Sequence, residues 1–166
     1  MIVKICGLHP ARDVKFCIEL GVNFLGFVFY EKSPRNIDIK NITYLKSYDK
    51  KSSSFVAVCV NPTDELIEKS IINNFDYIQL HGSETVERVK EIKSKGLKII
   101  KTIKIEKEAN IESYKKYEEA DIILFDTPGM EKSLRFPKNL ISKLPSGDRY
   151  ALAGSISEYN IENIAK

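Results

Sequence analysis

DYIQLHGSETVERVKEIKSKGLKIIKTI, at residues 76–103, contains the repeating unit of this chain. The apolar run at 76–80 predicts a strand, Ser83 is expected to cap a helix over 84–95, and a second apolar run predicts a strand at 97–103. The runs are continuous rather than alternating, as expected for strands that are covered on both faces. The stretch therefore predicts a β-α-β unit with parallel strands.

The same alternation continues in both directions along the chain. We expect further strands at 2–6, 23–29, 54–60, 121–126 and 149–153, and helices at 10–20, 37–47, 63–73, 109–119, near 138–144, and from Ser157 to Lys166. The segment Gly7-Leu8-His9-Pro10 lacks the glycine pattern that a doubly wound sheet would favour after its first strand. Polar residues instead follow nearly every strand, as in barrels that build their sites there. We therefore expect a single domain over residues 1–166, an α/β TIM (β/α)8-type barrel with seven βα units.

Composition excludes several classes of function. The 166 residues carry a net charge of +3 with no long run of like charges, which disfavours nucleic-acid binding. Cys6, Cys17 and Cys59 are an odd number without framework spacing, which favours a reducing cytoplasm. Lys4 interrupts the first apolar stretch, so we expect no signal peptide. No apolar run approaches the roughly 18 residues of a membrane span, so we expect no membrane partner.

Two residues at strand ends suggest acid-base chemistry. Cys6 ends the first apolar run and Asp126 ends the sixth, and parallel strands of a barrel end on the same face. A thiol and a carboxyl group there could form a base and acid pair. The alternatives are a small buried hydrophobic residue for Cys6 and a turn-capping carboxylate, beside Thr127, for Asp126. Cys17 and Cys59 fit core positions.

Short motifs stand at the predicted strand ends in a fixed order. They are KICG at 4–7, GFVF at 26–29, SPR at 33–35, VCVN at 58–61, QLHG at 79–82, KT at 101–102, FDT at 125–127 and LAG at 152–154. Each motif is weak alone. Together, over the whole chain, they resemble the phosphoribosylanthranilate isomerase family of tryptophan biosynthesis.

The resemblance implies an Amadori rearrangement of N-(5-phosphoribosyl)anthranilate. Cys6 matches the family's general base and Asp126 its general acid. A neighbouring cation or helix N-terminus would stabilise the thiolate, and Asp126 must hold its proton near neutral pH. No metal or organic cofactor is expected, because the iminium of the substrate is the electron sink. The expected partner is a small phosphorylated substrate, bound by a monomer or homodimer.

Further positions match the family's substrate contacts. A guanidinium at Arg35 suits the anthranilate carboxylate, and His81 is expected to hydrogen-bond the substrate or orient a neighbour. A solvated arginine and a turn histidine are the alternatives. Gly154 and Ser155 are expected to form half of the phosphate site. Lys132 would add charge nearby, although a solvated position suits it better.

The chain departs from the family pattern in two places. Ser155 stands where the family usually has the second glycine of a pair, and the chain stops at Lys166, before the family's eighth βα unit. The chain is therefore expected to be part of a longer product, to be completed by a partner chain, or to be a shortened, inactive relative. The competing functions are a non-catalytic ligand-binding barrel and a related sugar-phosphate isomerase of the bifunctional histidine/tryptophan type. The base of that type is an aspartate at the position of Cys6.

Overall fold

The computed structural model describes residues 1–9, 11–71, 74–105, 108–126, 142–154, 156–159 and 161–164. The chain divides into two compact parts, residues 2–99 and residues 100–166 together with Met1. Both parts contain parallel strands alternating with helices, in the order that the sequence predicts. Most of the helix expected near 138–144 lies outside the described residues.

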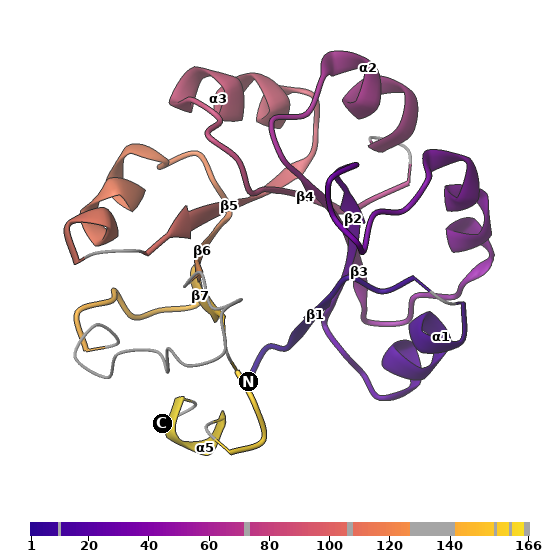
Figure 1. Cartoon of the computed structure of the whole chain (residues 1–166), viewed down its shortest axis with the longest axis horizontal. Coiled ribbons are helices and arrows are strands. Elements are labelled where there is room, and N and C mark those ends of the chain that lie inside the picture. Colours follow the sequence, from indigo (N-terminus) through magenta and orange to yellow (C-terminus); the bar gives the residue numbers. More distant parts are fainter. Residues whose placement is uncertain are drawn as a thin grey trace. The chain divides into compact units, whose positions relative to one another are not determined.

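Residues 2–99 contain four parallel strands that pair in chain order. The strands are β1 (Lys4–Cys6), β2 (Phe24–Phe29), β3 (Ser54–Cys59) and β4 (Tyr77–Leu80). The helices are α1 (Ala11–Glu19), η1 (Ile39–Ser47), α2 (Asp64–Leu66), η2 (Ile67–Ile71) and α3 (Val86–Ser94), and they lie on one side of the strands (Figure 1). Loops, rather than these helices, therefore lie at the C-terminal ends of the strands.

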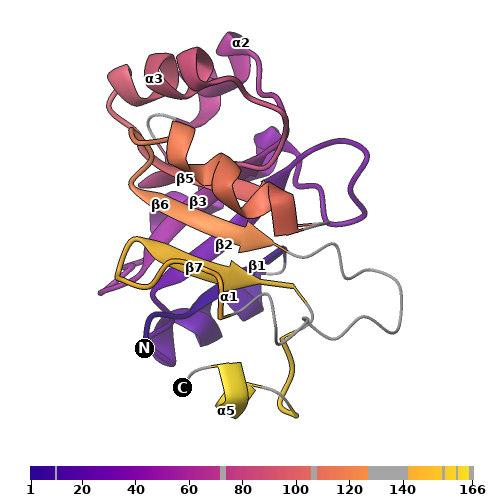
Figure 2. The same cartoon turned by 90° about the vertical axis from the view of Figure 1, so that its left-hand side faces the viewer.

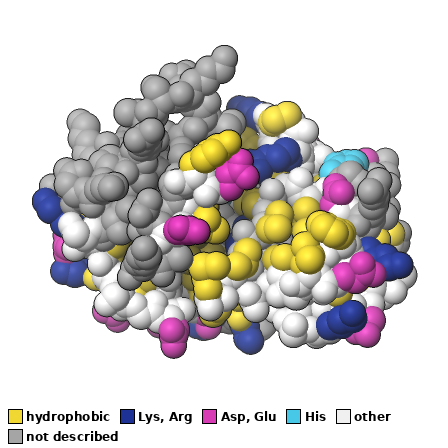
Figure 3. Space-filling model, turned by 90° about the horizontal axis from the view of Figure 1, so that it is seen from below, with side chains coloured by type: hydrophobic (Ala, Val, Ile, Leu, Met, Phe, Trp, Pro, Cys, Tyr) yellow, Lys and Arg dark blue, Asp and Glu magenta, His cyan; other side chains and the backbone are white. Residues whose placement is uncertain are grey.

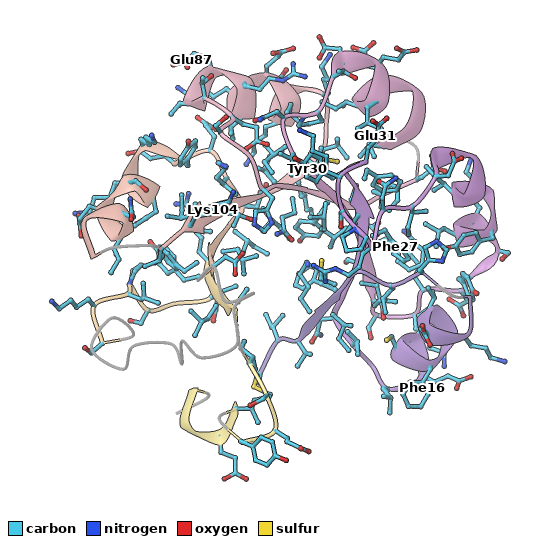
Figure 4. All side chains as sticks on the ribbon, viewed as in Figure 1. Phe16, Phe27, Tyr30, Glu31, Glu87 and Lys104 are labelled. Atoms are coloured by element: carbon cyan, nitrogen blue, oxygen red, sulfur yellow. The ribbon has the colours of Figure 1, made fainter. Side chains whose placement is uncertain are left out.

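The core of this part lies between the strands and the helices. Phe27 on β2 packs edge-on against Phe55 on β3, with ring centroids 5.3 Å apart, and also contacts Phe75 at 6.0 Å. Phe27 lies on the helix side of its strand, whereas Phe16 projects outward from α1 (Figure 4). Val14 on α1 is fully buried. Aromatic pairs therefore join β2 to β3 and to the segment before β4, and each such pair adds about 0.5–1.5 kcal/mol beyond its buried area.

The ends of α1 and α3 show how local sequence stops and starts a helix. Gly21 has φ +72°, and its N–H donates to the Ile18 carbonyl while Val22 N–H donates to Cys17, which is a Schellman ending. The start of α3 corrects the sequence prediction. Thr85, and not Ser83, caps the helix, because Thr85 Oγ1 accepts the Arg88 N–H at 3.2 Å. Glu84 therefore lies in the loop before the helix.

The segment at 37–47 also differs in helix type from the sequence prediction. Residues Ile39–Ser47 form a 3-10 helix, η1. Its sequence, IKNITYLKS, contains β-branched Ile39, Ile42 and Thr43, which lose rotamer freedom in an α-helix. Ile42 and Leu45 are buried. The segment therefore buries apolar side chains although it is wound more tightly than the predicted helix.

Residues 100–166 contain the second set of parallel strands. β5 (Lys98–Lys104), whose first two residues belong to the first part, pairs with β6 (Ile122–Asp126), and β6 pairs with β7 (Tyr150–Ala153). β6 and β7 run side by side in the same direction (Figure 2). Between β5 and β6 lies the 3-10 helix η3 (Glu108–Lys116), and α5 (Ile161–Ile164) follows β7. The rings of Tyr114, Phe125 and Tyr150 form the aromatic core of residues 100–166.

Several large hydrophobic side chains reach the surface near the N-terminus. Met1, Ile2, Phe16 and Leu20 are exposed, and hydrophobic side chains lie among charged ones on the face shown in Figure 3. Within the described ranges, no helix has the length and apolar character needed to cross a membrane.

Candidate active site

Cys6 lies at the C-terminal end of β1, where its register partner on β2 is Gly26. A Cβ atom at Gly26 would stand 3.1 Å from Cys6 Sγ and 2.9 Å from Lys4 Nζ. Glycine therefore makes room for the thiol, and Lys4 places an ammonium group on the same face of β1. The Cys6 side chain is half-buried, in contrast to the buried Cys17 and Cys59.

Arg35 reaches Cys6 from the loop after β2. Its Nη1 donates to the Cys6 carbonyl oxygen at 3.3 Å. The side chain crosses Gly7, where a Cβ atom would lie only 2.5 Å from Arg35 Cδ, and Gly7 has φ +84°. Asn36 Oδ1 accepts the Tyr30 N–H at 2.7 Å and closes the base of this loop. The structure thus brings together two residues, Cys6 and Arg35, that the sequence predicts for the site.

His81 follows β4 directly. Its N–H donates to the Cys59 carbonyl at 2.8 Å, which extends the ladder between β3 and β4. Its Nδ1 lies 3.4 Å from Nε2 of Gln79, as expected for side chains two residues apart on one face of a strand. Gln79 is buried and His81 is half-buried. The imidazole therefore has an interior neighbour on one side and remains accessible on the other.

Asp126 and Gly154 stand at neighbouring strand ends in residues 100–166. Asp126 is the last residue of β6, half-buried, with Lys104 on β5 and Ala153 on β7 as its register partners. Its carbonyl oxygen accepts the Ile105 N–H at 2.8 Å. Gly154 follows Ala153 with φ +101°, a backbone conformation that suits glycine. The predicted positions Thr127, Lys132 and Ser155 lie outside the described residues.

The remaining cysteines are in settings that suppress their reactivity. Burial, and then the negative charge of Glu84, raise the pKa of the Cys59 thiol far above its ordinary value. Burial, followed by the charge of Asp13, also raises the pKa of Cys17. Both thiols therefore stay protonated, and the sequence-based interpretation of these two cysteines as core residues is consistent with their burial.

Iodoacetamide at neutral pH should therefore alkylate Cys6 at least about tenfold faster than Cys17 or Cys59, because only the thiolate reacts and only Cys6 is accessible. Peptide mapping by mass spectrometry of the folded protein measures this. Cys6→Ala should remain unmodified over the same interval. Early adducts on Cys59 in folded protein would contradict the expectation.

One residue of this region was missed by sequence reasoning. Glu84 suggests from sequence only a favourable charge near a helix start, but its side chain is buried, with 4% exposed. Its Oε1 accepts the N–H groups of Asn61 and Gly82, which belong to two different loops. The one available signal was a carboxylate placed two residues after a glycine at a strand end.

Comparison with known proteins decides the family. A family model described as N-(5'phosphoribosyl)anthranilate (PRA) isomerase matches residues 3–166. The chain belongs to this family. Among curated PRA isomerases, that of Petrotoga mobilis is 36% identical over 99% of this chain and 80% of its own length. That of Sulfurihydrogenibium sp. is 32% identical over 99% of this chain and 82% of its own length.

Solved PRA isomerases confirm the fold class. The Thermotoga maritima enzyme matches 99% of this chain and 82% of its own, with a TM-score of 0.84 and 28% identity. The Thermus thermophilus enzyme has a TM-score of 0.85 and 26% identity, with the same coverage. The chain is thus a TIM-type barrel protein, as the sequence predicts, and its described residues contain seven parallel strands. It is an isomerase of tryptophan biosynthesis, and these matches favour that function over a ligand-binding barrel relative.

Two solved relatives indicate how family members assemble and bind. A PRA isomerase structure with 27% identity and a TM-score of 0.80 contains reduced 1-(o-carboxyphenylamino)-1-deoxyribulose 5-phosphate. It covers 99% of this chain and 81% of its own. The Thermotoga maritima enzyme is described as dimeric.

Proposed function

We propose that this chain converts N-(5'-phosphoribosyl)anthranilate to 1-(2-carboxyphenylamino)-1-deoxyribulose 5-phosphate, with Cys6 as the general base and Asp126 as the general acid. The observation that carries the proposal is the setting of Cys6. Its accessible thiol lies at a strand end opened by Gly26, with Lys4 on the same face and Arg35 on its carbonyl oxygen. An accessible side chain at a strand end can reach a substrate carbon, as a group that accepts a proton from it must.

In the proposed reaction Asp126 and Cys6 carry out two proton transfers, the final tautomerisation moves a proton from the C2 hydroxyl to C1, and there is no net redox change. Asp126 donates a proton to the furanose ring oxygen, the C1–O bond breaks, and the lone pair of the anilino nitrogen forms a Schiff base. Cys6 then removes the C2 proton, and the electrons of that bond neutralise the iminium to give an enolamine. Tautomerisation of the enolamine gives the ketone product. Positioned acid-base groups of this kind typically contribute about 10²- to 10⁴-fold in rate.

Three other groups are proposed to bind the substrate. Arg35 pairs with the anthranilate carboxylate, which suits its exposed guanidinium. His81 donates a hydrogen bond to the substrate from the end of β4. Backbone N–H groups at Gly154 and Ser155 bind the phosphate, as loops after late barrel strands commonly do. The three free cysteines suit a cytoplasmic location, which forms part of the same proposal.

Turnover tests the proposal directly. The purified chain should remove the fluorescence of phosphoribosylanthranilate, at a rate proportional to protein concentration and above the spontaneous decay of this substrate. Chromatography checks the identity of the product. Because substrate and product are isomers, the product should elute separately and have the mass of the substrate. A protein of confirmed mass and fold that leaves the decay unchanged would defeat the proposal.

Replacing Arg35 with glutamine should raise KM about 10- to 100-fold, because a charged hydrogen bond contributes about 1.5–3 kcal/mol and each 1.4 kcal/mol is tenfold. Steady-state kinetics with the fluorescent substrate measure the change. Lys32→Gln is the matched control, since Lys32 is an exposed cation of the same loop. Equal effects of the two substitutions would show that only the general positive charge of the loop matters.

A further inference from the structure

The buried carboxylate of Glu84 joins two loops of the first part. Its Oε1 accepts the Asn61 N–H, after β3, at 2.9 Å and the Gly82 N–H, after β4, at 3.0 Å. A buried carboxylate is costly unless hydrogen bonds compensate it, and bonds to a charged acceptor are the strong ones. The negative charge also contributes to the raised pKa of the nearby Cys59 thiol. The hydrogen bonds from these two loops therefore fix the position of the Glu84 carboxylate.

Asn61, in the loop after β3, accepts a hydrogen bond from the loop after β4. Its Oδ1 accepts the Ser83 N–H at 2.9 Å, and its backbone has φ +47°, a left-handed conformation that asparagine tolerates. Gly82 fits between the two acceptors. A Cβ atom there would stand 2.4 Å from Asn61 Oδ1 and 2.8 Å from Glu84 Oε1. Asn61, Gly82 and Glu84 therefore form one interlock, in which two acceptors hold three N–H groups.

The interlock adjoins His81. The His81 N–H is held by the Cys59 carbonyl at 2.8 Å, and the next N–H, that of Gly82, is held by Glu84. The backbone is thus fixed on both sides of the residue that carries the imidazole. A loop tied at successive amides has few alternative conformations, so it presents its side chain in one orientation at little entropic cost on binding.

We infer that Glu84 is a positioning residue, which holds His81 in the orientation that meets the substrate by joining the loops after β3 and β4. The inference rests on the proposed role of His81 in substrate binding. It assigns a task to Asn61 and Gly82, two motif residues that the acid-base mechanism does not use. It also separates Glu84 from Glu87, which projects from α3 away from the strands (Figure 4).

The test is a double-mutant cycle in the full chain, with KM and kcat for phosphoribosylanthranilate as readouts. Glu84→Gln weakens the charged acceptor and should raise KM about tenfold while kcat changes less than about twofold. Glu87→Gln is the matched control and should leave both constants unchanged. In a His81→Ala background, Glu84→Gln should add nothing to KM, because groups that act through one another are not additive.

A second variant covers the case in which Glu84→Gln folds poorly. Asn61→Gly keeps a residue that accepts the left-handed backbone and removes only the side-chain acceptor of Ser83. It should raise KM about threefold, since the neutral acceptor of both the Ser83 N–H and the Ser83 hydroxyl is lost. Unchanged KM in Asn61→Gly and Glu84→Gln, or the same loss with and without His81, would overturn the inference. A His81→Ala variant with unchanged KM would instead refute the proposed role of His81.

Discussion

Replacing Cys6 with alanine should lower kcat about 10²- to 10⁴-fold, the range expected when a general base is removed. The thiol has no substitute on its strand, because Lys4 is a cation, and Ile5 is an apolar residue of the opposite face of β1. Binding should change little, since the proposed substrate contacts lie on other residues. Fluorescence-based turnover under saturating substrate measures the loss.

Protein stability should be nearly unaffected by this substitution. Cys6 is half-buried at a strand end, so loss of its sulfur leaves no large core cavity, and Tm should change by less than about 3 °C. Cys17→Ala is the matched control. Cys17 is 5% exposed on α1, so this change should cost about 1 kcal/mol of stability and leave kcat intact.

Cys6→Asp extends the same test. It restores a group that can accept a proton at the end of β1, and it should recover part of the activity that Cys6→Ala loses. Turnover by Cys6→Ala at the rate of the unaltered chain would exclude Cys6 as the base. Recovery by Cys6→Asp would show that proton transfer, and not sulfur chemistry, is required.

Replacing Asp126 with asparagine should also lower kcat about 10²- to 10⁴-fold, because the amide cannot donate a carboxyl proton to the ring oxygen. Asparagine has nearly the same shape, and the Asp126 backbone bond to Ile105 does not involve the side chain. The fold around β6 should therefore persist. Circular dichroism and thermal unfolding verify this before the kinetics are compared.

Asp121→Asn is the matched control for this second substitution. Asp121 directly precedes β6, at the end of the strand opposite to Asp126. It should leave turnover unchanged. If both variants lose activity equally, the effect reflects charge or stability rather than acid catalysis. If neither does, another group supplies the proton.

Much of the fold could be predicted because its signals are local. Apolar runs gave β1 to β7 within one or two residues at each end. Gly21 ends α1 in a left-handed conformation, and a glycine just after a helix is a signal carried by a few neighbouring residues. The start of α3 was wrong because two hydroxyl residues, Ser83 and Thr85, compete for the cap. The contact of Ser83 N–H with Asn61, distant in sequence, decides between them.

In the candidate site, too, some features can be predicted from the sequence and others depend on tertiary contacts. The sequence by itself determined which chemical groups stand at the strand ends, including Cys6, His81 and Asp126, because strand periodicity and the residue types can be read along the chain. Only the tertiary structure placed Arg35 on the Cys6 carbonyl and turned Glu84 into the loops after β3 and β4. Those contacts depend on the register of parallel strands, which is set by packing between segments far apart in the sequence and leaves no periodic trace in any one of them.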